Sequence, residues 1–271
     1  MCFDIAGPLT PHFGYTGMDK KPLYLWFAYP DDLLSAETAE ACTALLSEEE
    51  RARVLRLKFE RHRRESLATR ALMRTALSYG RPVPAQDWQF EVNEHGKPAV
   101  RSASEPDCVL HFNLSNSLGL VVCLVAEGAE VGVDVEPFER AEQILKLAPE
   151  VFSTAEQAQL ERLEEAEKFN RALSLWTLKE SYIKARGMGL SLPLDKFSFL
   201  FDAEGIRLEI DASLGDRPER WRFCLLDHAG HRIAAMVERA GTSNLEVLEA
   251  RPIVAPPVRV SVGLTQWFPR A

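Results

Sequence analysis

The chain has 271 residues, which suits one large domain or two small ones and is ample for a hydrophobic core. Hydrophobic residues make up 46% of it and charged residues 27%, with no low-complexity tract, as is typical of a globular protein. The formal net charge of −8 argues against nucleic acid as a partner, because such binding depends on a basic face that neutralises phosphates.

Nothing in the sequence indicates a membrane or an oxidising compartment. Its start has no basic segment followed by an apolar stretch, and no apolar run approaches the length of about 18 residues that a membrane span needs. The five cysteines are scattered and include no Cys-x-x-Cys pair, as expected for free thiols in a reducing compartment. We therefore expect a cytoplasmic protein with no membrane partner.

The first half of the chain is predicted to contain one strand, two helices and then three strands. Residues 1–20 form an N-terminal extension broken by glycines and prolines, and residues 23–29 form the first strand. Ser47, with Glu50 three residues later, makes a capping box that opens a helix, and a second helix ends at Gly80. The further strands are expected at residues 88–92, 109–114 and 120–126.

The second half is predicted to contain a similar set of elements. Its first strand covers residues 131–136, and Ser153 with Glu156 makes a second capping box. A long helix from about residue 168 stops at Gly187. Four more strands are expected at residues 197–201, 206–210, 221–226 and 232–237.

An internal repeat with a period of about 110 residues relates the two halves. Ser47-Glu-Glu-Glu and Lys58-Phe-Glu-Arg precede one long helix, while Ser153-Thr-Ala-Glu and Lys168-Phe-Asn-Arg precede the other. We therefore divide the chain into four parts. These are an N-terminal extension at residues 1–20, an α+β half at 21–128, a second α+β half at 129–249 and a C-terminal tail with little regular structure at 250–271.

Three carboxylates and a lysine form the clearest candidate site. Asp134 and Glu136 are two apart on a strand, so their side chains point to the same face. Glu180 and Lys184 are four apart on the long helix, with about 5–6 Å between their Cβ atoms. Hard oxygen ligands beside a cation suit Mg²⁺ holding a phosphate-bearing substrate.

A simpler interpretation of these residues stays open. Glu180 and Lys184 could form an ordinary surface ion pair, and Asp134 and Glu136 could lie on the solvated face of an edge strand. Apolar neighbours along the helix, including Trp176, favour a cleft instead.

Residues 51–74 form the one basic island in this acidic protein. Its members are Arg51, Arg53, Arg56, Lys58, Arg61, Arg63, Arg64, Arg70 and Arg74. The island is either a solvated helical face or a surface for phosphate or an acidic partner, because the arginine fork matches phosphate oxygens. Lys97, in the turn after strand 88–92, is either a surface lysine of an ordinary hairpin turn or a point charge for a phosphate.

Four sequence blocks occur in a recognisable order and spacing. They are Gly96-Lys-Pro98, Phe112-Asn-Leu-Ser-Asn-Ser117, Val131-Gly-Val-Asp-Val-Glu136 and Trp176-Thr-Leu-Lys-Glu-Ser-Tyr-Ile-Lys184. Together they resemble the signature of the 4′-phosphopantetheinyl transferases over roughly residues 47–200. The continuation from Gly187 to Phe199 is similar to the surfactin-type (Sfp-type) branch in particular.

The resemblance implies a fold and an activity. The fold would be a pseudo-dimer of two α+β halves with the active site in the cleft between them. The activity would be Mg²⁺-dependent transfer of the 4′-phosphopantetheine arm of coenzyme A to a serine of an apo acyl or peptidyl carrier protein, releasing 3′,5′-ADP. Mn²⁺ would be the alternative ion, and the protein would act as a monomer.

Site roles follow from the residues together with the resemblance. Asp134, Glu136 and Glu180 would hold the metal, Glu180 would also be the general base, and Lys184 would stabilise the pyrophosphate oxygens. The resemblance implies a larger set of contacts to coenzyme A. These are Arg51, Arg53 and Arg64 for its 3′-phosphate, the Ser66 hydroxyl, and Lys97, Ser115, Asn116, Lys179 and Lys184 for its phosphates.

Asn116 departs from the family pattern, which usually has histidine there. An asparagine can donate a neutral hydrogen bond but carries no positive charge, so we expect a weaker phosphate contact at this position. Trp176 is expected to pack the long helix against the sheet.

Two other classes of function remain open at this point. The protein could be another Mg²⁺-dependent enzyme that cleaves pyrophosphates, or a non-catalytic module that binds coenzyme A or a carrier protein. Docking of an acidic carrier could use either the basic island or apolar residues near the start of a helix.

Overall fold

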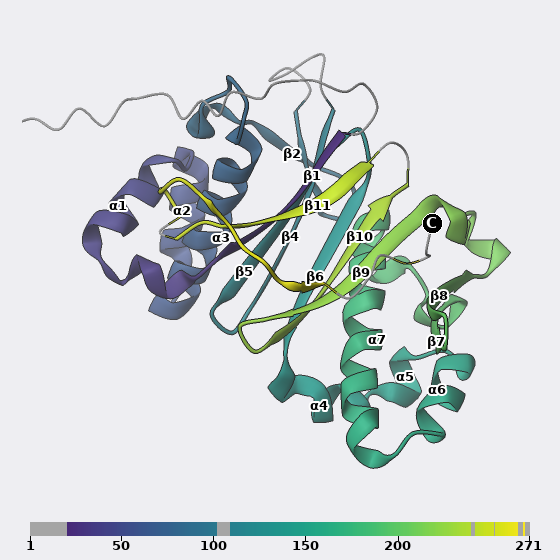
Figure 1. Cartoon of the computed structure of the whole chain (residues 1–271). Helices are drawn as coiled ribbons and strands as arrows, with labels where there is room; N and C mark the ends of the chain where they lie inside the picture. The colour runs from purple at the N-terminus through teal and green to yellow at the C-terminus, as the bar shows by residue number, and fades with distance from the viewer. Residues whose placement is uncertain (1–20, 102–108, 240–241, 252, 265–267, 269–271) are drawn as a thin grey trace, which may run out of the picture.

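The computed structural model describes residues 21–101, 109–239, 242–251, 253–264 and 268. They form an α+β fold, as predicted (Figure 1). The α-helices are α1 (Ala36–Ala44), α2 (Glu48–Arg56), α3 (Glu60–Ser78), α4 (Ala141–Lys146), α5 (Ala148–Val151), α6 (Thr154–Glu161) and α7 (Glu165–Arg186).

Four sheets account for the strands of the described residues. A five-stranded sheet has the order β12 (Val258–Arg259), β11 (Thr242–Glu249), β1 (Lys21–Ala28), β5 (Leu120–Glu127), β4 (Leu110–Ser117). A four-stranded sheet has the order β13 (Gly263–Leu264), β9 (Trp221–His228), β10 (His231–Glu238), β6 (Val131–Pro137). Two hairpins, β2 (Phe90–Val92) with β3 (Pro98–Val100) and β7 (Phe197–Asp202) with β8 (Gly205–Ile210), form the small sheets.

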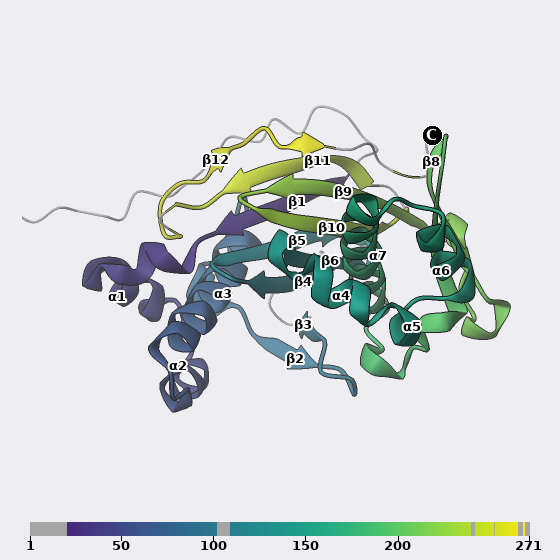
Figure 2. The ribbon, with the colours of Figure 1, turned by 90° about the horizontal axis from the view of Figure 1, so that it is seen from below.

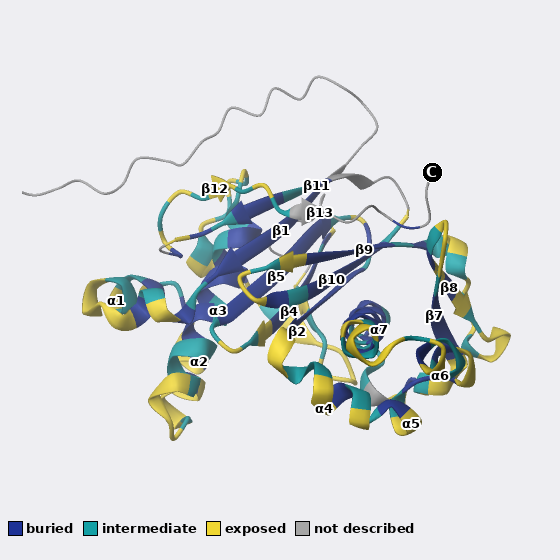
Figure 3. Cartoon of the chain, turned by 60° about the horizontal axis from the view of Figure 1, so that its bottom comes forward, coloured by how far each residue is buried: buried dark blue, intermediate teal, exposed yellow. Residues whose placement is uncertain are grey.

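The two larger sheets pack between two groups of helices, as Figure 3 shows. Strand β1 illustrates the reason, because successive side chains of a strand point to opposite faces. Leu23 and Leu25 belong to a core shared with the four-stranded sheet, whereas Tyr24 and Trp26 pack toward α1 and α3. A third core fills the space between the four-stranded sheet and the helices α4 to α7.

The edge strands β4 and β6 bring the two larger sheets together. The Asn113 side chain of β4 is 6% exposed, and its Oδ1 accepts a hydrogen bond of 2.9 Å from the backbone N–H of Val133 in β6. This bond satisfies an edge N–H that no neighbouring strand covers. The two sequence blocks that carry Ser115 and Asp134 therefore lie side by side.

Helix ends agree closely with the sequence patterns. Ser47 with Glu50 and Ser153 with Glu156 both form complete capping boxes, at the starts of α2 and α6. Helix α7 ends at Gly187, whose φ of 63° lies in the left-handed region that glycine adopts without strain. No described helix is long and apolar enough to cross a membrane.

Strand β11 was not predicted. It comes from residues assigned to the second half but pairs in parallel with β1, so that Leu25 lies opposite Val247. The division into halves at residues 21–128 and 129–249 stays a prediction, and β11 of the second part joins the sheet of the first. The predicted extension at residues 1–20 lies outside the described residues.

Candidate active site

A glycine in β6 allows helix α7 to lie directly on the strand. A Cβ atom added at Gly132 would lie 2.0 Å from the backbone oxygen of Ser181 and 2.4 Å from the backbone nitrogen of Ala185. Real Cβ atoms do not approach backbone this closely, so any side chain here would push α7 away. The close packing explains how β6 and α7 bring their charged residues into contact.

Asp134, Ser115 and Lys184 form a compact polar group at this contact. The Lys184 ammonium lies 2.7 Å from Asp134 Oδ1 and 2.9 Å from Ser115 Oγ. Ser115 Oγ in turn donates to Asp134 Oδ1 over 3.0 Å. The aspartate is 4% exposed, so its charge is shielded from solvent and strongly coupled to the lysine.

Glu136 lies on the same face of β6 but is held by different partners. Both of its carboxylate oxygens accept from Arg140 Nη1, at 2.5 and 2.7 Å, and Oε1 also accepts from Trp176 Nε1 at 2.9 Å. The pKa of Glu136 is raised above its usual value by burial and by the Asp134 charge, against the opposing effects of Trp176 and Arg140. Trp176 therefore orients a carboxylate in addition to packing the helix.

Glu180 is the carboxylate left unengaged. In the part of the chain that the structure describes, its side chain has no hydrogen-bond or ion-pair partner. Burial raises the pKa of Glu180, and the charges of Asp134 and Glu136 raise it further, against the opposing effects of Lys184 and Arg140. A half-buried carboxylate with a raised pKa suits proton transfer.

The donor set fits a hard cation in part. Asp134 Oδ2 is buried and has no hydrogen-bond partner in the described part of the chain, and such an orphaned oxygen is a natural ligand for Mg²⁺. Among the described residues, however, no three carboxylate, imidazole or thiolate groups are already arranged to hold a metal. Glu136 faces Arg140 instead. The predicted metal site at Asp134, Glu136 and Glu180 therefore stays a prediction that requires Glu136 to leave Arg140.

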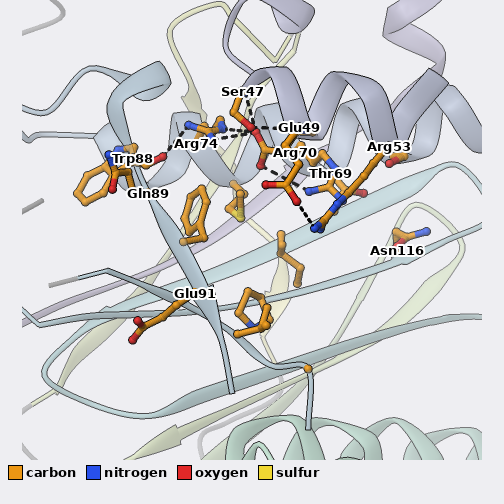
Figure 4. A pocket seen from close by; sticks show the side chains of 18 of the residues that line it. Ser47, Glu49, Arg53, Thr69, Arg70, Arg74, Trp88, Gln89, Glu91 and Asn116 are labelled. Carbon is orange, nitrogen blue, oxygen red and sulfur yellow. Dashed lines mark hydrogen bonds and ion pairs between the residues drawn. The ribbon is translucent and has the colours of Figure 1, made fainter. Parts of the chain in front are cut away.

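A pocket of about 850 Å³ lies on the other face of β4. It is enclosed by α2, α3, the β2–β3 hairpin and the end of β4, and Figure 4 shows Arg53, Arg70 and Asn116 around it. Ser115 and Asn116 are consecutive in β4, so their side chains point to opposite faces. The pocket and the carboxylate group thus meet at the end of one strand.

The structure separates the residues predicted to bind coenzyme A. Arg53, Ser66 and Asn116 line the pocket, whereas Ser115 joins the Asp134 group. Arg51 does not line this pocket, because its guanidinium donates to backbone oxygens at the end of α1, at 3.0 and 3.3 Å. Arg64 lies 3.6 Å from Asp31 and is also absent from the pocket wall.

Two lysines predicted to contact phosphates are used elsewhere. Lys179 is fully buried, with its ammonium 2.7 Å from the Glu156 carboxylate and 2.7 Å from the backbone oxygen of Phe197, so a phosphate contact there is wrong. Lys97 lies 2.7 Å from Glu130 and does not line the pocket, so its predicted phosphate contact stays a prediction. In both cases a protein carboxylate already neutralises the charge.

Several pocket residues were not singled out by the sequence. Thr69 and His62 line the pocket, as does Arg70, which belongs to the basic island. Within the described ranges Arg70 Nε is buried without a partner, and its Nη1 makes a long contact of 3.5 Å to Glu50. Arg74, by contrast, is 2% exposed and bound to Glu50 at 2.8 Å, which makes it structural.

The buried pair offers a direct test of the corrected role of Lys179. Replacing Lys179 by methionine leaves Glu156 charged and unpaired in the core, so we expect the free energy of unfolding to fall by about 3–5 kcal/mol. Chemical denaturation measures this loss. The exposed pair of Lys146 and Glu142 provides the control, since Lys146→Met should change stability by less than about 1 kcal/mol. A Lys179→Met variant that keeps its stability but binds coenzyme A more weakly would contradict the assignment.

Comparison with known families covers most of the chain. Residues 34–129 match the family model described as 4'-phosphopantetheinyl transferase, N-terminal, and residues 130–236 match that of the 4'-phosphopantetheinyl transferase superfamily. The chain therefore has the two consecutive parts of such an enzyme.

Individual relatives agree with the family models. The 4'-phosphopantetheinyl transferase Sfp of Bacillus subtilis is 32% identical over 177 residues, which are 65% of this chain and 76% of that protein. Another Bacillus subtilis 4'-phosphopantetheinyl transferase is 31% identical over 194 residues, covering 72% and 83% of the two chains. A crystal structure of a holo-(acyl-carrier-protein) synthase from Bacillus anthracis is 18% identical, with a TM-score of 0.35, over 42% of this chain and 96% of that one.

The chain is thus an enzyme of the phosphopantetheinyl transferase class. Within that class it belongs to the Sfp-type 4′-phosphopantetheinyl transferases.

Proposed function

We propose that this protein transfers the 4′-phosphopantetheine arm of coenzyme A to a serine of an apo acyl or peptidyl carrier protein, with Mg²⁺, and releases 3′,5′-ADP. One observation carries the proposal. The pocket and the group of Asp134, Glu180 and Lys184 lie at the end of the same strand, β4, on opposite sides. A donor bound in the pocket would reach the carboxylates with its pyrophosphate.

The reaction is an attack of the serine hydroxyl on the β-phosphate of coenzyme A. The serine oxygen forms a bond to phosphorus, the bond to the leaving phosphate oxygen breaks, and 3′,5′-ADP departs with the electron pair. Such a transfer depends on positioning and on stabilisation of the charge that develops. Mg²⁺, held by Asp134 and Glu180 with Glu136, would supply part of that stabilisation when bound.

The residues of the chain provide the remaining chemistry. Glu180 accepts the serine proton, because it is the one carboxylate of the group without a described partner and its pKa is raised. Lys184 donates to the pyrophosphate oxygens from its position 2.7 Å from Asp134. Asp134 keeps that ammonium aimed at the junction of pocket and helix.

The pocket binds the adenosine end and the 3′-phosphate. Arg70 supplies positive charge, as does Arg53, whose Nη2 lies 2.5 Å from Glu49 Oε1 on the exposed side of α2. The hydroxyl groups of Ser66 and Thr69 and the amide of Asn116 supply neutral donors. Arg70 is the strongest anchor, since its unpaired buried Nε gains a partner when phosphate enters.

Replacing Arg70 by methionine is expected to raise the KM for coenzyme A about 10-fold to 100-fold, because a hydrogen bond to a charged group contributes about 1.5–3 kcal/mol. Steady-state kinetics with a fixed apo carrier measure the change. Arg51→Met is the matched control from the same basic island, and its KM should equal that of the wild type. The reverse order of the two variants would place the phosphate at Arg51.

The function itself is tested by following 3′,5′-ADP. Chromatography of the reaction mixture should detect 3′,5′-ADP only when coenzyme A, Mg²⁺ and an apo carrier protein are all present. Release without a carrier would indicate a pyrophosphate-cleaving hydrolase, and binding of coenzyme A without release would indicate a non-catalytic module. We also propose that the protein acts as a cytoplasmic monomer, since one chain supplies both the pocket and the carboxylates.

A further inference from the structure

The turn between β2 and β3 is attached to the end of the catalytic helix. Asn93 Nδ2 donates to the backbone oxygen of Gly187 over 2.9 Å, and Lys97 Nζ donates to that of Ala185 over 2.9 Å. The last carbonyl groups of a helix have no partner within the helix, so both side chains satisfy oxygens that would otherwise need water. Figure 2 shows the hairpin reaching from β4 toward α7.

Lys97 has no donor left for a ligand. An ammonium group has three N–H donors, and those of Lys97 face Glu130 at 2.7 Å, Val131 at 3.4 Å and Ala185 at 2.9 Å. The ion-pair partner of Lys97, the Glu130 carboxylate, is ionised at neutral pH. Burial would raise the pKa of Glu130, but hydrogen bonds from His111 and Lys97 hold it at about 2.

The contact between turn and helix is tight as well as polar. Asn93 Oδ1 accepts from the backbone N–H groups of His95 and Lys97, at 3.0 and 2.8 Å, which fixes the shape of the turn. A Cβ atom added at Gly187 would lie 2.8 Å from Lys97 Cδ and 3.2 Å from Asn93 Nδ2. A methyl group there requires these two side chains to shift, which disturbs their hydrogen bonds to the helix end.

The hairpin is also a wall of the donor pocket. Phe90, Val92 and Pro98 line that pocket, while Glu180 and Lys184 project from the helix to which the turn is attached. We propose that the β2–β3 turn is a strap that fixes the donor pocket relative to α7, and that Lys97 is a positioning residue and not a phosphate ligand. That this pocket binds coenzyme A rests on the proposed function.

Two substitutions from opposite sides of the contact test the strap. Lys97→Met removes the ion pair, and Gly187→Ala sets a methyl group against the Lys97 and Asn93 side chains without replacing either residue. Each should speed hydrogen exchange in the peptide covering residues 89–101 at least about tenfold, the effect of losing one hydrogen bond to a charged group. Each should also raise the KM for coenzyme A by about the same factor, and the double variant should add little because both changes release one contact.

Gly215→Ala is the matched control for backbone strain. Gly215 has a φ of 61°, close to the 63° of Gly187, but a Cβ atom there would meet nothing within 4 Å. It should leave the exchange of residues 89–101 and the KM unchanged, since general destabilisation lowers the amount of active enzyme without altering its KM.

The opposite pattern would overturn the strap. If Lys97→Met raises the KM while exchange stays at the wild-type rate and Gly187→Ala matches Gly215→Ala, Lys97 acts on the ligand directly. Failure of the wild type to transfer phosphopantetheine would reject the proposed function alone, because the exchange comparison measures the strap without any turnover.

Discussion

Replacing Glu180 with glutamine should lower the turnover number about 10²–10⁴-fold, the usual contribution of a general base. Glutamine keeps the size and polarity of the side chain but cannot accept the serine proton. Because Glu180 does not line the pocket, the KM for coenzyme A should change little. Single-turnover kinetics with an apo carrier separate the chemical step from binding.

Glu165→Gln is the control for this experiment. Glu165 lies on the same helix, is 72% exposed and pairs with Lys168 at 3.5 Å, so its loss should leave turnover unchanged. A Glu180→Gln variant that turns over at the wild-type rate would assign the base to another group and remove Glu180 from the mechanism.

Asp134→Asn is expected to lower kcat/KM at least about 10²-fold. The substitution removes a hard ligand for Mg²⁺ and the partner of Lys184, and stabilisation by a metal contributes several kcal/mol. Binding of Mn²⁺, measured by electron paramagnetic resonance without substrate, should weaken in parallel. Unchanged Mn²⁺ affinity would argue against Asp134 as a metal ligand even if activity fell.

Asp31→Asn is the corresponding control. Asp31 is 79% exposed and lies 3.6 Å from Arg64, away from the carboxylate group. Its replacement should change neither activity nor Mn²⁺ binding, since an exposed ion pair of this kind contributes little.

Local patterns in the sequence were sufficient for most of the elements. The capping boxes at Ser47 and Ser153 and the stop at Gly187 depend on neighbouring residues only, and the structure has all three. The two-residue period of β6 likewise predicts that Asp134 and Glu136 share a face, and both contact residues of α7.

Strand β11 could not be predicted in this way. Its partner β1 lies more than two hundred residues earlier in the chain, as the pairing of Leu25 with Val247 shows. Parallel pairing over such a distance leaves no turn signal, and nothing in the sequence of residues 242–249 specifies the register.

The buried position of Lys179 could have been predicted from the sequence. Successive residues of a helix are about 100° apart, so Lys179 cannot share the face of Glu180 and Lys184. It points instead into the core, where Glu156 pairs with it. The resemblance favoured a phosphate contact, and helical geometry favoured the core.

The choice among the arginines needed the structure. Arg51, Arg53, Arg64 and Arg70 are all typical phosphate ligands, and the sequence shows only that they lie on helices. Their tertiary contacts distinguish them. Arg51 binds the end of α1 and Arg64 faces Asp31. Arg53 and Arg70 line the pocket. Arg140 was missed because its partner Glu136 belongs to a strand, where no helical spacing links the two.

Intact-mass spectrometry of an apo carrier protein, incubated with this protein, coenzyme A and Mg²⁺, tests the central claim most directly. The account predicts that the carrier gains one phosphopantetheine group, and that the gain is lost with EDTA and with Glu180→Gln but kept with Glu165→Gln. A carrier mass that stays unchanged across acyl and peptidyl carriers, with the wild-type protein folded and coenzyme A bound, would contradict it.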